Sequence, residues 1–211
     1  MVTKEEIMND IKEKGDDIKL EHLDKIVKKM EYDQETRKNA FILMTDIYIK
    51  RLWWNNAARA FLNAADLAKT FDDKKELFFK AAELFVKTGD YFTAEDTFRK
   101  ALVLAAKKDR NATWDRVLGV YMAYARELES KRMQTKAISV YNKILTLNLP
   151  IEQANQIRDR MAELYEKIGK PREATYIRQQ KASALESDKK KSMPIDEEDD
   201  DHTSAQDFIG V

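Results

Sequence analysis

The sequence predicts an all-α fold in which antiparallel helix pairs stack on one another, followed by a disordered acidic C-terminal tail. The first observation is composition: the 211 residues include only five Gly and three Pro, whereas sheets joined by many tight turns need more of both. The second is a repeat of small and aromatic residues at helical spacing. The chain also has no Cys, which excludes disulfides, Cys zinc sites and thiol nucleophiles.

A recurring alanine defines the repeat. It occupies Ala57, Ala94, Ala137 and Ala174, at intervals of 37, 43 and 37 residues. Four positions after this Ala, three copies have a bulky residue: Phe61, Phe98 and Tyr141. Three positions further on, the same copies have Ala64, Ala101 and Ile144. Twelve positions before the Ala, all four copies have a small residue: Thr45, Ala82, Ala125 and Ala162. Positions i, i+4 and i+7 share one face of a helix. Each copy is therefore predicted to be two helices that approach closely where their small residues meet.

The breaks between helices fit this prediction. Gly89 and Gly169 suit the left-handed residue that ends a helix, and Pro171 suits the first turn of the next one. The longer interval of 43 residues puts six extra residues in the region 103–116. We expect them to lengthen the helices there by a turn or more.

The pattern of small residue, aromatic, turn Gly, then Ala, aromatic and Ala resembles the tetratricopeptide repeat (TPR) family over roughly residues 37–184. The resemblance implies a right-handed superhelix of helix pairs, a TPR-like α-solenoid, with a concave groove that binds proteins. A non-repeating helical bundle is the alternative. In the last copy Arg178 and Lys181 replace the aromatic and small residues, which is typical of a terminal repeat that faces water.

Three regions are expected. Residues 1–32 form an N-terminal capping helix pair, opened by a capping box at Thr3-Lys-Glu-Glu6 and marked by Ile7, Ile11 and Ile26. Residues 33–185 hold about four TPR-like helix pairs. Residues 186–211 contain nine acidic residues and three Lys, a net charge of −6, so the first 185 residues carry +6. Such a self-repelling segment is predicted to be a disordered tail.

The sequence disfavours catalysis. It has two His, at His22 and His202, without a partner at metal-ligand spacing, and it has no Gly-rich phosphate loop or nucleophile motif. We therefore expect no enzyme activity, no metal, no cofactor and no small-molecule substrate. A body charge of +6 is a thin electrostatic footprint for nucleic acid. The lack of a long apolar stretch or leader predicts a cytoplasmic protein without a membrane span.

The TPR resemblance also implies which residues line the groove, because the first helix of each pair faces it. The implied positions are Asn39, Ile42, Asp46, Ile49, Glu76, Phe79, Glu83, Val86, Gly119, Met122, Arg126, Glu129, Gln156, Asp159, Glu163 and Glu166. They lack the Lys, Asn and Arg set with which some TPR grooves clamp a chain's C-terminal carboxylate. An apolar groove with an acidic margin suits a peptide or helix with apolar anchors and basic flanks. About half of these residues are expected to pack between repeats instead, and Trp53 is a possible exposed anchor.

The predicted function is a non-catalytic adaptor or scaffold that binds a protein or peptide in the groove. One alternative comes from the segment 52–65, which resembles vesicle-fusion attachment proteins of the SNAP type in its Trp, Ala-Phe and Ala-Ala spacing. Another is a regulator of an enzyme or nucleic-acid machine whose acidic tail imitates a polyanion. The final Asp207–Val211 segment is predicted to be a linear motif that docks on the basic body or on another protein.

Overall fold

A computed structural model describes residues 4–147 and 149–192. This part of the chain holds ten α-helices and a short 3₁₀ helix, and no strand. The bounds are α1 Lys4–Ile11, α2 Asp16–Lys28, α3 Gln34–Lys50, α4 Trp54–Asp66, α5 Phe71–Thr88, α6 Tyr91–Leu104, η1 Lys107–Asp109, α7 Arg110–Ser130, α8 Gln134–Leu145, α9 Ile151–Lys167 and α10 Pro171–Ser192. The chain divides into two compact units, residues 1–148 and 149–211. The all-α prediction is confirmed.

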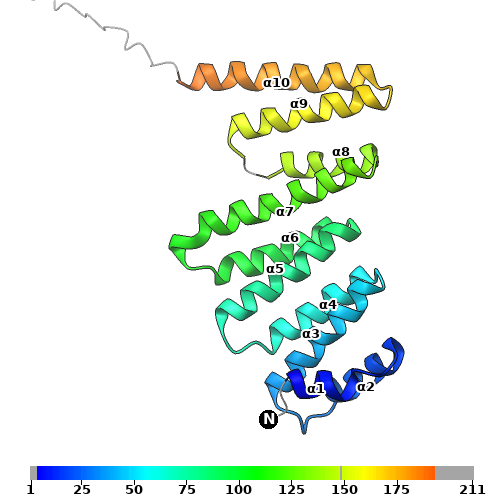
Figure 1. Cartoon of the computed structure of the whole chain (residues 1–211). Helices are drawn as coiled ribbons and strands as arrows, with labels where there is room; N and C mark the ends of the chain where they lie inside the picture. The colour runs from blue at the N-terminus through cyan, green and yellow to red at the C-terminus, as the bar shows by residue number, and fades with distance from the viewer. Residues whose placement is uncertain (1–3, 148, 193–211) are drawn as a thin grey trace, which may run out of the picture. The chain divides into compact units, whose positions relative to one another are not determined.

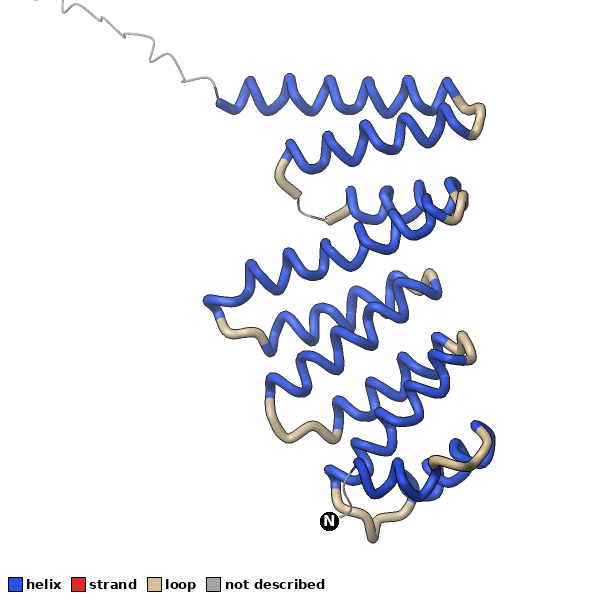
Figure 2. The backbone as a smooth tube through the Cα atoms, in the orientation of Figure 1, coloured by secondary structure: helices blue, strands red, loops and turns tan. Residues whose placement is uncertain are grey.

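Consecutive helices form antiparallel pairs. In the first unit the pairs are α3 with α4, α5 with α6 and α7 with α8, and each pair is joined by a short turn (Figures 1 and 2). In the second unit α9 packs against α10 in the same way. These antiparallel pairs are the repeating two-helix units that the sequence predicts.

The repeating alanines explain how the helices approach one another. Ala57, Ala94, Ala137 and Ala174 are all fully buried, at 0% exposure. In α6 the aromatic residue four positions later, Phe98, is also buried. Because an Ala occupies little volume, two helix backbones can meet closely there while the neighbouring aromatic ring fills the adjoining space. The predicted packing role of these alanines is confirmed.

The turns repeat as well. The residue five positions before each repeating Ala adopts the left-handed conformation in all four copies: Leu52 (φ 59°), Gly89 (φ 82°), Arg132 (φ 58°) and Gly169 (φ 75°). Sequence reasoning found only the two glycines, since nothing about Leu or Arg signals a positive φ. The repeat thus imposes its backbone conformation even where the side chain disfavours it.

Leu52 offers a test of that strain. A left-handed Leu costs about 1–2 kcal/mol, and its side chain is largely exposed, so little packing is lost by removing it. We expect Leu52→Gly to raise the free energy of unfolding by up to about 1 kcal/mol, because the flexibility of Gly in the unfolded chain offsets part of the gain. Chemical denaturation measures this change. Leu52→Ala is the control, since it keeps the strain; an equal gain in Leu52→Ala would contradict the explanation.

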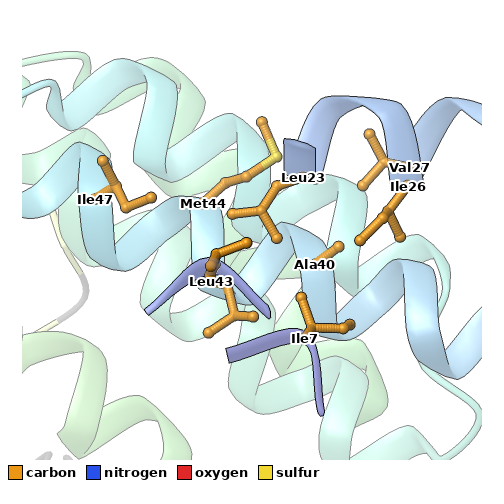
Figure 3. Close-up of a cluster of buried hydrophobic side chains, with 9 residues drawn as sticks. Ile7, Leu23, Ile26, Val27, Ala40, Leu43, Met44 and Ile47 are labelled. Atoms are coloured by element: carbon orange, nitrogen blue, oxygen red, sulfur yellow. The ribbon is translucent and has the colours of Figure 1, made fainter. Parts of the chain in front are cut away.

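The first two helices pack on α3. Figure 3 shows Leu23 of α2 beside Met44 of α3, and Ile26 of α2 and Ile7 of α1 on either side of Ala40 of α3. All five side chains are buried in one apolar cluster. Thr3 of the predicted capping box lies outside the described residues. The N-terminal helices and the first helix of the next pair therefore share a core.

The extra residues between the second and third copies take two forms. Helix α6 ends at Leu104, and the chain then passes through η1 before α7 begins at Arg110. Helix α7 has 21 residues, compared with 18 in α5. The connection at residues 105–109 is only slightly longer than the one at residues 67–70 between α4 and α5. The largest single change is therefore the longer helix α7, as expected.

The C-terminal helix is longer than predicted. Helix α10 continues to Ser192, past residue 185, where the sequence predicts the end of the repeats. Once a helix is nucleated, each added residue costs little, and α10 can extend beyond the part that packs on α9. Residues 193–211, which include the acidic run and the predicted docking motif, lie outside the described residues.

Candidate functional site

A groove of about 450 Å³ lies between α5 and α7, the first helices of two successive pairs. Its lining residues are Glu83, Lys87, Arg116, Gly119, Val120, Ala123, Tyr124 and Glu127. Small residues on α7 keep this side open: Gly119 and Ala123 are one helical turn apart and both are exposed. The groove therefore combines charged groups with an apolar wall that another chain can approach closely.

Arg116 joins the two helices at one end of the groove. Its guanidinium donates to both carboxylate oxygens of Glu76, at 2.7 and 2.8 Å. The same guanidinium lies 4.2 Å from the centre of the Phe79 ring. The hydrogen bonds lower the pKa of Glu76, because they favour its charged form. Arg116 is thus engaged within the protein rather than free for a partner.

Two further charges in the groove also have partners. The Lys87 ammonium lies 5.3 Å from the Trp54 ring centre, within cation–π range, and its backbone carbonyl accepts a 3.0 Å hydrogen bond from the Tyr124 hydroxyl. Glu127 forms an ion pair with Lys131 one turn later. These contacts hold the rim of the groove in place.

Glu83 differs from its neighbours. It is half-buried, and within the described residues it makes no hydrogen bond or ion pair. Burial raises its pKa, with Glu76 adding to the effect, while Arg116, Lys87 and Lys80 act in the opposite direction from a distance. A partly desolvated carboxylate without a direct partner is unfavourable in the free protein. A hydrogen bond or ion pair from a partner would therefore stabilise Glu83 more than any other residue of this groove.

Among the residues that the resemblance places in the groove, Glu83 and Gly119 line it, whereas Val86 is fully buried. Phe79 is fully buried, so its assignment as a contact residue is corrected: its ring packs 5.4 Å from that of Phe98 and beneath Arg116. Glu76 is paired with Arg116. Met122 is half-buried and Arg126 exposed, both elsewhere on α7. The lining residues that the resemblance missed are Lys87, Arg116, Val120, Ala123, Tyr124 and Glu127.

The other predicted residues lie on different helices. On α3, Asp46 is exposed, while Asn39, Ile42 and Ile49 are half-buried. In the second unit Gln156 and Asp159 are exposed on α9, and Asp159 is paired with Lys181 of α10 at 2.6 Å. Their role in binding a partner stays a prediction.

Trp53 is held in a defined position at the turn between α3 and α4. Its side chain is 46% exposed. The Arg51 guanidinium lies 5.1 Å from its ring centre, and Arg51 is itself anchored by ion pairs to Asp16 and Asp17. An exposed Trp that is fixed by its neighbours has the features of an anchor residue, and its contact with a partner stays a prediction.

Two other kinds of site are absent from the described ranges. Across residues 4–147 and 149–192, no group of three or more His, Asp or Glu side chains is arranged to hold a metal ion. In the same ranges no helix is sufficiently long and apolar to cross a bilayer.

Comparison with known proteins finds similarity at the level of structure. No protein-family model matches the chain, and no curated protein matches it. Three solved structures align with it over most of their length. BtubC (BKLC) from P. vanneervenii is 15% identical, with 98% of this chain and 87% of that chain covered and a TM-score of 0.39. MamA is 18% identical, with 82% and 88% covered and a TM-score of 0.35.

The third structure is a variant of a Podospora anserina kinesin light chain with nearly identical TPR-like repeats. It is 13% identical, with 89% of this chain and 94% of that chain covered and a TM-score of 0.37. At these identities and TM-scores the similarity concerns the helix-pair repeat, and no activity or partner is transferred from it.

Proposed function

We propose that the protein is a non-catalytic scaffold that binds a peptide or helix of a partner protein in the groove between α5 and α7. The bound segment places a Lys or Arg side chain against Glu83 and an apolar side chain against Val120 and Ala123. Stacked helix pairs build extended surfaces of this kind. The observation that carries the proposal is the half-buried Glu83 carboxylate, which has no direct partner in the described part of the chain.

The free-energy cost of desolvating the Glu83 carboxylate favours a basic group on the ligand. The free protein bears the cost of partly desolvating the Glu83 carboxylate, which its raised pKa reflects. A bound ammonium or guanidinium supplies a charge-assisted hydrogen bond that the free groove lacks. Of the two cations that line the groove, Arg116 is paired with Glu76 and Lys87 lies over the Trp54 ring, so both already have a favourable contact that the Glu83 carboxylate lacks. These contacts therefore favour a positively charged side chain of the partner beside Glu83.

The groove does not have the organisation of an active site. Its lining residues contain no Ser, Cys or Thr nucleophile with an adjacent base. The charged groups that line it, apart from Glu83, are engaged in contacts within the protein. Neither the SNAP-type alternative nor the polyanion-mimic alternative is favoured by a contact in the described residues.

A random twelve-residue peptide library displayed on phage tests the proposal. We expect peptides selected on the full-length protein to pair a Lys or Arg with a nearby apolar residue. Selection on Glu83→Lys should replace the basic residue with Asp or Glu. Asp72→Lys is the matched control, because this exposed residue on α5 is outside the groove. Identical peptide preferences for the wild type and Glu83→Lys would refute the proposal.

Glu83→Gln separates binding from stability. At neutral pH we expect this variant to be more stable than the wild type by less than about 1 kcal/mol, since it removes a partly buried, unpaired charge that remains accessible to solvent. The raised pKa means that the native protein holds this proton more tightly than the unfolded chain does. The wild type therefore regains stability as pH falls through the native pKa of Glu83, and the advantage of Gln disappears.

Thermal unfolding of both proteins across a pH series measures this convergence. A selected basic peptide should bind Glu83→Gln several-fold more weakly at neutral pH, by the loss of a charge-assisted hydrogen bond. A variant that is more stable but binds less well is characteristic of a binding residue. A constant stability difference at all pH values would show that the Glu83 charge is not the cause.

A further inference from the structure

A second hollow lies on a different side of α7, between α6 and α7. It has a volume of about 260 Å³. Its walls are mostly apolar, formed by Phe98, Leu102, Trp114, Val117, Tyr121 and Leu147, with Glu95 and Arg99 as the two charged lining residues. None of these residues lines the α5–α7 groove.

Among the described residues, Tyr121, at the interface between α6 and α7, lacks a hydrogen bond that a buried tyrosine usually makes. Its side chain is fully buried, and its hydroxyl has no hydrogen-bond partner within the described residues. Its ring contacts Phe98 at 5.9 Å and Tyr91 at 6.2 Å between ring centres. Buried hydroxyls usually find a partner, so this one indicates that the interface between α6 and α7 is not optimised for the free protein.

Arg99 lies at the edge of this hollow and also lines a third hollow of about 390 Å³ against α5. It is exposed, and it forms no ion pair or hydrogen bond with any described residue. The neighbouring charges are paired: Glu95 with Lys143 at 2.7 Å and Asp96 with Lys100 at 2.9 Å. Among these charged residues of α6, Arg99 is therefore the one without an ion pair in the described ranges, and it lies between the mainly apolar hollow and the third hollow, whose lining includes Lys74, Asp96 and Lys100.

We propose that the outer side of α6 is a second protein-binding site, which takes an acidic segment of a partner with one large aromatic side chain. The aromatic ring enters the hollow between α6 and α7, and a neighbouring carboxylate of the segment binds Arg99. This charge preference is opposite to that of the α5–α7 groove. The proposal rests on a scaffold role for the protein but not on Glu83.

The volume of the hollow and the positive charge of Arg99 together favour an acidic segment with one aromatic side chain. A dry cavity of about 150 Å³ is known to hold benzene, whereas pockets for drug-sized ligands begin near about 300 Å³. A hollow of about 260 Å³ thus accommodates one aromatic side chain. The unpaired Arg99 guanidinium favours a carboxylate, which it can bind through two parallel hydrogen bonds. Hot spots of protein interfaces commonly combine such an anchored ring with a charged neighbour.

Nuclear magnetic resonance titration of the full-length, isotope-labelled protein tests the proposal. The probe is the peptide acetyl-Glu-Asp-Phe-Gly-Glu-amide, with three controls: Ala in place of Phe, Lys in place of each acidic residue, and N-acetylphenylalaninamide alone. We expect saturable shifts in α6 and α7 for the probe, with a dissociation constant of about 1 mM as for other short ligands. Each control should bind at least about five-fold more weakly, a loss of about 1 kcal/mol.

Variants of the protein provide the second half of the test. Leu102→Trp and, from a different segment, Leu147→Trp are designed to fill the hollow and should abolish the shifts; circular dichroism establishes that each remains folded. Arg99→Glu should weaken the probe at least about five-fold, and Glu83→Gln should leave it unchanged.

Equal binding of the Ala peptide, or unchanged binding in a folded filled variant, would overturn the proposal. Equal binding of N-acetylphenylalaninamide would overturn it as well and would assign the hollow to small aromatic molecules. Loss of binding in Glu83→Gln would place the probe in the α5–α7 groove, so failure here and failure of the proposed function give different results.

Discussion

Replacing Phe98 with Ala is expected to lower the free energy of unfolding by about 3–5 kcal/mol. Phe98 is 2% exposed, and its ring contacts both Phe79 of the same helix pair and Tyr121 of α7. Its removal deletes buried apolar area and leaves a cavity that these two rings cannot fill without moving. A loss of this size is a large part of the stability of a typical domain, so the variant should unfold at a clearly lower denaturant concentration.

Phe92→Ala is the matched control, because Phe92 is on the same helix and is 85% exposed. The same substitution there should change the free energy of unfolding by no more than about 0.5 kcal/mol. Urea denaturation followed by circular dichroism compares the two variants. If both lost similar stability, the ring at position 98 would not have the packing role that the repeat assigns to it.

The core of this fold was predictable because it depends on side-chain volume at fixed spacing. An alanine such as Ala94, with Phe98 one turn later, has few uses other than close helix packing, and both are buried as expected. The turns were only half predictable. Gly89 reveals its left-handed conformation through its residue type, whereas Leu52 adopts the same conformation because the helices on either side require it.

The groove was harder to predict, because its lining depends on the exact rotation of each helix. Phe79 and Glu83 are one turn apart on α5, yet the first is fully buried and the second faces the groove. The extra residues before α7 also change which of its residues meet α5. Arg116, which sequence reasoning did not select, thereby reaches Glu76, a pair separated by 40 positions that no local pattern reveals.

The remaining large effect concerns the N-terminal end of the array. Ile26 of α2 is 4% exposed and belongs to the cluster that joins α1 and α2 to α3. Ile26→Asp would place a carboxylate in this apolar cluster, on the side of Ala40 (Figure 3). We expect it to lower local stability by at least about 3 kcal/mol, from lost apolar contact and from desolvation of the new charge.

In Ile26→Asp, which helices lose stability is more informative than how much stability is lost. In a stack of helix pairs each element depends mainly on its immediate neighbours, so α1 to α3 should open while α7 and α8 stay protected from hydrogen exchange. Ile18→Asp on the same helix is the control, since Ile18 is 57% exposed and should tolerate the charge. Ile26→Ala gives a milder cavity if the Asp variant does not fold. Equal loss of protection throughout residues 4–147 would show one cooperative core in place of neighbour-to-neighbour stabilisation.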